Sequence, residues 1–173
     1  MHTRRSLSER LAFAAAAASA AALLLGAQSR STFAGEFVPV DLRGTVTIES
    51  TVPIGDDGSV LTVEVTARDV GRGTYFGRYT SVLRLVVDID LGTGLPLRGG
   101  GTVVQTNADG STVTWLNHFE GIETRSTIIG GNGRFENAEG RVEGVSILNP
   151  DGTFSYDEAG WITSIGSNRR ASP

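Results

Sequence analysis

Apolar and polar residues alternate along most of the chain after Gly35, a pattern typical of strands that bury one face. In the first such segment Val40, Leu42, Val46 and Ile48 share one face, and polar residues occupy the other. The alternation returns over 61–68, 79–89, 101–106, 111–120, 124–129, 141–148, 153–156 and 161–165. Turn signals rich in Gly, Asp and Asn separate these segments, and no stretch shows a helical period. The pattern predicts an all-β domain of about eight strands.

Strands with one apolar and one polar face must bury the apolar one. Either a sandwich of two sheets or a closed barrel achieves this, and closure also removes exposed strand edges. The 23 glycines suit tight turns and bends at barrel corners. Alternation by itself does not separate the two architectures.

Residues 1–34 follow a different pattern. Arg4, Arg5 and Arg10 precede an almost wholly apolar run, Leu11–Leu25, and small residues follow it. This order is typical of a secretory signal peptide. The run of about 15 residues is shorter than the roughly 20 that a membrane-spanning helix needs. We therefore predict a signal peptide at 1–34, a single domain at 35–173 and a secreted or periplasmic protein; an uncleaved N-terminal anchor is the alternative.

The charge of the predicted mature part argues against several partners. Residues 35–173 contain 11 arginines and 18 acidic residues, a formal charge of −7. Nucleic acids and anionic membranes both favour basic proteins, so neither is an expected partner after cleavage of the signal. The chain has no cysteine, so no disulfide stabilises it.

Three segments, in order, resemble one family of barrels. The sequence from Gly130 to Gly140 fits the pattern Gly-Gly-x-Gly-x-Phe-x-x-Ala-x-Gly at every fixed position. Residues 70–79 resemble a glycine-rich entry into a long strand, and residues 106–121 resemble a hairpin that turns at Asp109-Gly110. Together they resemble the allene oxide cyclase and dirigent family, including its bacterial secreted relatives of unknown function.

The resemblance implies an eight-stranded antiparallel, calycin-like barrel with an apolar lumen open at one end. Plant members are often trimers, which implies a homo-oligomer. Allene oxide cyclases cyclise an unsaturated epoxide, and dirigent proteins steer the stereochemistry of coupling reactions. Neither activity uses a metal or an organic cofactor, so none is expected here. The resemblance assigns no acid or base residue to this sequence.

The glycine motif is interpreted as structural. Gly130, Gly131 and Gly133 permit backbone angles and close approaches that a Cβ would forbid, and Phe135 can then pack under the end of the barrel. Gly140 completes the motif at the start of the next strand. A phosphate-binding loop would lead into a long helix, whereas a strand is predicted here.

The sequence lacks the residues that most classes of enzyme use for catalysis. A nucleophilic thiol is absent, and His118 is the single histidine after residue 34, so a multi-histidine metal site is excluded. Asp88-Ile89-Asp90 is the pattern nearest to a calcium loop, but it lacks the other ligands. No metal site is predicted.

Alternation also predicts which side chains face the lumen. Tyr79, Leu83, Trp115, Asn117 and Phe119 lie on apolar faces and are the candidate ligand-binding residues. Gln105 and Tyr75 are further inward polar candidates. Residues at the alternate positions are expected to point outward. His118 is one of them, and the charged ones are Glu64, Arg68, Arg78, Arg84, Asp88 and Glu120. The lumen is thus expected to be nearly free of ionisable groups.

These features favour non-catalytic binding of an apolar small molecule, or a structural extracellular role. The alternative is a dirigent- or cyclase-like enzyme that orients a reactive guest. A lumen with room for a ligand and a buried carboxylate or arginine beside Tyr79 or Asn117 would favour the enzyme. A lumen filled by Leu83, Trp115 and Phe119 would favour the structural role.

Overall fold

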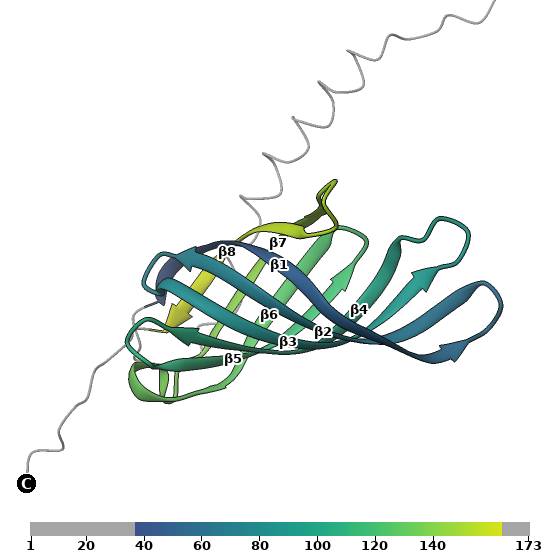
Figure 1. Cartoon of the computed structure of the whole chain (residues 1–173). Helices are drawn as coiled ribbons and strands as arrows, with labels where there is room; N and C mark the ends of the chain where they lie inside the picture. The colour runs from purple at the N-terminus through teal and green to yellow at the C-terminus, as the bar shows by residue number, and fades with distance from the viewer. Residues whose placement is uncertain (1–36, 164–173) are drawn as a thin grey trace, which may run out of the picture. The chain divides into compact units, whose positions relative to one another are not determined.

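A computed structural model describes residues 37–163, in which eight strands form one antiparallel sheet that closes on itself (Figure 1). The elements are β1 (Phe37–Asp56), β2 (Val60–Gly73), β3 (Gly77–Asp90), β4 (Pro96–Asn107), β5 (Thr112–Glu120), β6 (Glu123–Gly131), the 3₁₀ helix η1 (Gly133–Phe135), β7 (Gly140–Leu148) and β8 (Phe154–Thr163). Each strand pairs with the next, and β8 pairs with β1 to close the barrel. The predicted all-β barrel is confirmed; the predicted signal peptide lies outside the described residues.

The segments predicted at 153–156 and 161–165 form a single strand, β8, within the described residues. Glu158 pairs with Leu42 and Gly160 pairs with Val40, so the ladder continues through the gap between the two predicted strands. Asp157, Glu158 and Gly160 interrupt the apolar alternation between the two segments. Backbone hydrogen bonds to β1 and β7 continue the strand through these residues although the apolar alternation is lost.

One end of the barrel is closed by a packed aromatic cluster. Phe76, Trp115 and Phe135 are at most 2% exposed, and the rings of Phe76 and Phe135 stack with centroids 5.2 Å apart. Trp115 donates its indole hydrogen bond to Gln105, 3.1 Å away. Aliphatic residues from β1, β5, β6, β7 and β8 complete this cluster. A second cluster, from β2 and β3, lines one wall of the interior.

The glycine motif builds part of this closed end. Gly131 ends β6, Gly140 begins β7, and η1 places Phe135 in the aromatic cluster. Gly133 has a φ of +61°, which side chains with a Cβ rarely adopt. Gly130 shows neither a positive φ nor a neighbour that a Cβ would contact, so the predicted need for glycine there is wrong. In residues 37–163 no helix is long and apolar enough to cross a bilayer.

Strand β1 extends past its partner β8. Pairing between them covers Phe37 to Val46, whereas the rest of β1 pairs with β2. This leaves one edge of the second half of β1 without a partner strand among the described residues. Two register shifts and Pro53 interrupt that half, and both features hinder further strand addition.

Candidate functional site

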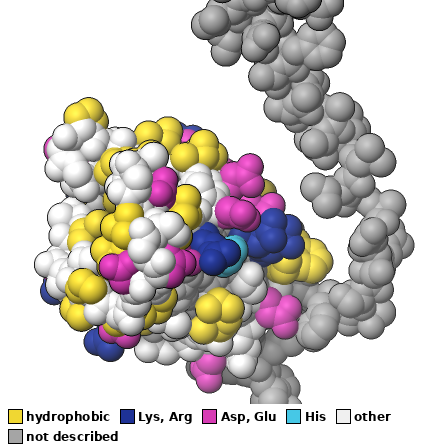
Figure 2. All heavy atoms as spheres, turned by 90° about the vertical axis from the view of Figure 1, so that its right-hand side faces the viewer, with side chains coloured by type: hydrophobic (Ala, Val, Ile, Leu, Met, Phe, Trp, Pro, Cys, Tyr) yellow, Lys and Arg dark blue, Asp and Glu magenta, His cyan; other side chains and the backbone are white. Residues whose placement is uncertain are grey.

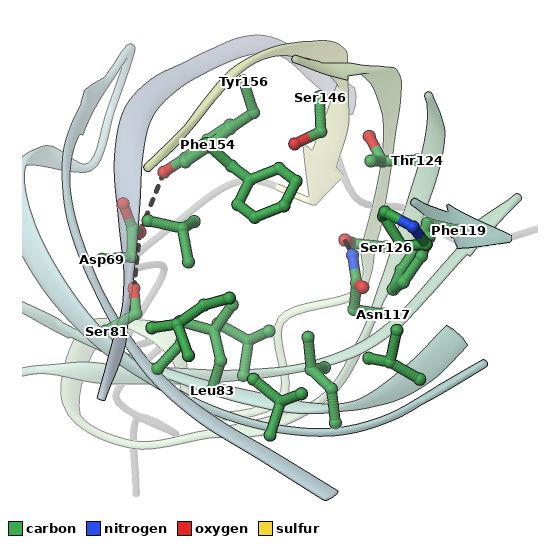
Figure 3. A pocket seen from close by; sticks show the side chains of 18 of the residues that line it. Asp69, Ser81, Leu83, Asn117, Phe119, Thr124, Ser126, Ser146, Phe154 and Tyr156 are labelled. Carbon is green, nitrogen blue, oxygen red and sulfur yellow. Dashed lines mark hydrogen bonds between the residues drawn. The ribbon is translucent and has the colours of Figure 1, made fainter. Parts of the chain in front are cut away.

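The barrel encloses a cavity of about 350 Å³. Its walls are mainly aliphatic and aromatic, as seen along the lumen in Figure 3. The lining includes Gly94, Gly121 and Gly152, which belong to the connections β3–β4, β5–β6 and β7–β8. The cavity therefore extends to the end of the barrel opposite the aromatic cluster. A volume of this size is at the lower end of the roughly 300–1,000 Å³ found for ligand pockets.

The structure places all five predicted lumen residues on the cavity wall. Tyr79 and Leu83 come from β3, and Trp115, Asn117 and Phe119 come from β5. The β3–β4 and β4–β5 ladders have no register shift at these positions. The alternation of inward and outward side chains therefore continues without interruption along both strands. That these residues bind a ligand stays a prediction.

The outward side chains also lie as the parity predicts. Within the described part of the chain His118 is the single histidine, and it lies on the surface beside basic side chains (Figure 2). Figure 2 also shows hydrophobic side chains separated by acidic ones on this face. Asp88 contacts Arg98 with its Oδ2 2.9 Å from Nε. Among residues 37–163 no group of three potential ligand side chains could hold a metal ion.

The prediction for Tyr75 is wrong. Its side chain is 51% exposed and its φ is +67°, because it lies in the turn between β2 and β3. The next residue, Phe76, enters the barrel instead. Gln105, the other additional inward candidate, is 2% exposed and bonds to Trp115 and Asn107 inside the closed end.

The expectation of a lumen nearly free of ionisable groups is also wrong. Asp69 on β2 and Glu158 on β8 are buried and line the cavity. Asp69 continues the inward parity of Val65 and Ala67, but the apolar alternation ends before it. Glu158 lies in the part of β8 that the sequence pattern did not predict as strand. Continuing the alternation of inward and outward positions beyond the last apolar residue of each strand would have placed both carboxyl groups in the lumen.

Asp69 is the centre of a hydrogen-bonded cluster on one wall of the lumen (Figure 3). Its Oδ2 accepts hydrogen bonds from Ser81 Oγ at 3.0 Å and from the hydroxyl of Tyr156 at 2.9 Å. The hydroxyls of Tyr79 and Tyr156 share a further hydrogen bond of 2.6 Å. Asp69 Oδ1 is buried with no hydrogen-bond partner among the described residues. The result is a continuous path from Tyr79 through Tyr156 to a carboxyl group.

Two facing glycines make room for this cluster. Gly44 on β1 and Gly71 on β2 are register partners, and both occupy inward positions. A Cβ at Gly71 would lie 2.5 Å from the ring of Tyr79, and one at Gly44 would lie 2.5 Å from the hydroxyl of Tyr156. Real Cβ atoms do not approach so closely, so the two tyrosines occupy space that side chains at these positions would fill.

Burial shifts the proton equilibria of the cluster. Removal from water raises the pKa of Asp69 to about 6, although its hydrogen bonds to Tyr156 and Ser81 act in the opposite direction. Burial likewise raises the pKa of Tyr79 and of Tyr156, and the nearby Asp69 raises both further. Both phenols are therefore neutral at physiological pH, whereas the carboxyl of Asp69 gains or loses its proton close to that pH.

Glu158 gives the lumen a second carboxyl. Its Oε1 accepts a hydrogen bond of 2.7 Å from Thr124, and burial raises its pKa. Asn117 donates a hydrogen bond of 3.0 Å to Ser126 on the same side of the cavity. No arginine, lysine or histidine lines the cavity among the described residues. The lumen thus combines apolar walls with two protonatable carboxyls and has no cation to balance them.

Comparisons with known proteins identify the fold. No protein-family model and no curated protein sequence matches this chain. The solved pterocarpan synthase dirigent protein PsPTS1 is similar with a TM-score of 0.52 and 10% identity, over 77% of this chain and 98% of that one. A second pterocarpan synthase dirigent protein, GePTS1, is similar with a TM-score of 0.46 and 14% identity, over 80% and 96% of the two chains. The match to PsPTS1 shows a dirigent-like barrel; the resemblance to allene oxide cyclases stays a prediction.

Proposed function

We propose that this protein is a dirigent-like enzyme whose lumen holds a neutral, largely apolar small molecule in one conformation while Asp69 exchanges a proton with it. The observation that carries the proposal is a buried carboxyl with a pKa of about 6 on the wall of an apolar cavity. A group of this pKa can donate and accept protons near neutral pH, which general acid–base catalysis requires.

The chemistry is an intramolecular ring closure that needs no co-reactant. In the structure the hydroxyl of Tyr156 donates its hydrogen bond to Asp69. Protonation of Asp69 reverses this bond, so that neutral Asp69 donates to Tyr156 and the hydroxyl of Tyr156 can pass its own proton to a carbonyl-type oxygen of the guest. A hydroxyl of the guest adds to the carbon that this protonation activates, and its proton returns to Asp69. One bond forms between oxygen and carbon, the carbonyl π bond is lost, and the product is an isomer of the guest. The apolar walls contribute by restricting the guest to one reactive geometry.

Non-catalytic binding is the second candidate function, because the same apolar walls would hold a guest without changing it. A purely structural role is less favoured, since Leu83, Trp115 and Phe119 line a cavity rather than fill it. Export through the predicted signal peptide and assembly into a homo-oligomer remain part of the proposal.

The two candidates differ in what happens to the guest. Native mass spectrometry of protein purified from its source organism should show a bound small molecule. Incubation of that molecule with fresh protein should give an isomer of the same mass, resolved by chromatography on a chiral column. Asp69→Asn should bind the molecule but form none of the isomer. Isomer formation by neither protein would favour binding alone, and equal formation by both would exclude Asp69 as the acid.

The charges of the lumen predict the charge of its guest. Two carboxyls and no cation make a bound anion unfavourable, because its charge would be neither solvated nor paired. At pH 7.5 we expect 2-naphthol to quench the fluorescence of Trp115 and to bind about tenfold or more tightly than 2-naphthoate, which has the same ring system. Ala67→Phe, which places a ring in the cavity, should weaken binding of 2-naphthol. Equal affinity for the two probes would contradict the predicted selectivity.

A further inference from the structure

Three arginines form a row on the outer surface of the barrel, away from the lumen. Arg43 on β1 is the register partner of Arg72 on β2, and Arg72 is the register partner of Arg78 on β3. Opposed residues of an antiparallel pair project from the same face of the sheet. Neighbouring strands lie about 4.8 Å apart, so the row extends over roughly 10 Å.

This Arg43–Arg72–Arg78 row differs from the other arginines of the chain. Of the nine arginines within residues 37–163, six have a carboxylate oxygen within 4.0 Å. Arg72, Arg78 and Arg84 have no ion pair among the described residues. Arg43 contacts Asp157 at 3.2 Å, but both side chains are more than half exposed. Asp157 and the exposed Asp41 lie at the Arg43 end. Among the described residues no carboxylate oxygen lies within 4.0 Å of the Arg72 or Arg78 guanidinium.

The row borders a shallow groove that is open to solvent. The other border is uncharged, because Thr45 and Val70 are the next outward residues along β1 and β2 and are register partners of each other. The backbone of Gly44 and Gly71 lies between the two borders. A ligand in this groove would meet guanidinium groups on one side and a hydroxyl and an aliphatic group on the other.

Like charges at directly opposed positions of two strands repel each other and destabilise the sheet. An oxyanion bound between them replaces this repulsion by attraction to both groups. Guanidinium groups also match the geometry of phosphate oxygens, to which they donate paired hydrogen bonds. We infer that the Arg43–Arg72–Arg78 row is a binding site for a small linear oligophosphate, whose successive charged groups can contact successive strands. Tyr156, which the proposed chemistry in the lumen uses, also borders this groove, whereas the three arginines take no part in that chemistry.

Tripolyphosphate is the probe that tests this site. At equal ionic strength it should raise the melting temperature of the full chain more than orthophosphate or chloride does. Arg72→Gln should weaken tripolyphosphate binding by about tenfold, measured by isothermal titration calorimetry. Without the anion the same variant should melt at a slightly higher temperature than the parent chain, because the repulsion of Arg72 by Arg43 and by Arg78 is removed. Arg78→Gln provides a second variant with the same expected loss of affinity.

Arg84→Gln is the matched control. Arg84 is an exposed arginine of β3 without an ion pair among the described residues, and its register partners are Thr66 and Thr102 rather than arginines. It should bind tripolyphosphate as tightly as the parent chain does. An equal loss in Arg72→Gln and Arg84→Gln, or an equal response to orthophosphate, would overturn the site, because both results indicate non-specific attraction.

Discussion

Asparagine in place of Asp69 should make this barrel more stable at pH 8. Asp69 is 4% exposed, one of its carboxyl oxygens has no hydrogen-bond partner among the described residues, and burial raises its pKa to about 6. At pH 8 the folded protein must therefore hold an ionised carboxylate in an apolar wall. Asparagine has nearly the same shape and carries no charge at any pH.

The sign of the pH dependence follows from the direction of the shift. The pKa is higher in the folded chain than its ordinary value of 3.8, so the folded state binds the proton more tightly than the unfolded state does. The stabilisation by the protonated group is complete below pH 4 and is lost as the pH rises through about 6. The loss amounts to roughly 2–3 kcal/mol at one carboxyl. Asp69→Asn should remove this part of the slope.

Urea unfolding between pH 4 and pH 8 measures the effect. Glu158→Gln should remove a further part of the slope, since burial also raises the pKa of Glu158. Glu64→Gln is the control, because Glu64 is an exposed residue on the outer face of the same strand as Asp69. It should change the free energy of unfolding by less than about 0.5 kcal/mol. A less stable Asp69→Asn protein at pH 8 would show that the ionised carboxylate stabilises the fold.

The expected gain in stability also bears on function. A buried carboxyl that destabilises the folded chain is poorly explained by a structural role, whereas active sites commonly contain groups whose presence costs stability. If Asp69→Asn stabilises the barrel and also stops turnover, both results have the same cause. They follow from placing a protonatable group where water cannot solvate it.

The sequence was sufficient to predict the walls of the barrel and the side on which most residues lie. Alternation is a local property, and it correctly placed Tyr79, Asn117 and His118 relative to the lumen. It did not find Asp69 and Glu158, because strand ends were assigned where the apolar residues stop. Backbone hydrogen bonds, rather than apolar side chains, continue both strands past those points.

Other features depend on register, which a single strand does not reveal. Arg43 and Arg72 are 29 positions apart, and only the pairing of β1 with β2 makes them neighbours. The same pairing brings Gly44 opposite Gly71 and so makes space for Tyr79 and Tyr156. The volume of the lumen likewise depends on how far each side chain extends across it, which alternation does not determine.

The closed end of the barrel should be far more sensitive to loss of an aromatic ring than the lumen. Phe135 is 0% exposed, its ring stacks on Phe76, and the guanidinium of Arg134 lies 4.7 Å from its centroid on the ring face. Phe135→Ala should therefore lower the free energy of unfolding by about 3–5 kcal/mol, since the surrounding residues form a packed cluster that cannot close around the gap.

Phe119→Ala is the matched comparison. Phe119 is half-buried and already borders the cavity, so its removal enlarges an existing space instead of creating a new one. We expect a loss of less than about 2 kcal/mol in the same urea experiment, because fewer contacts are broken. Equal losses in the two variants would mean that the lumen is as tightly packed as the closed end. In that case the barrel would have no room for a guest, and the proposed reaction would lose its site.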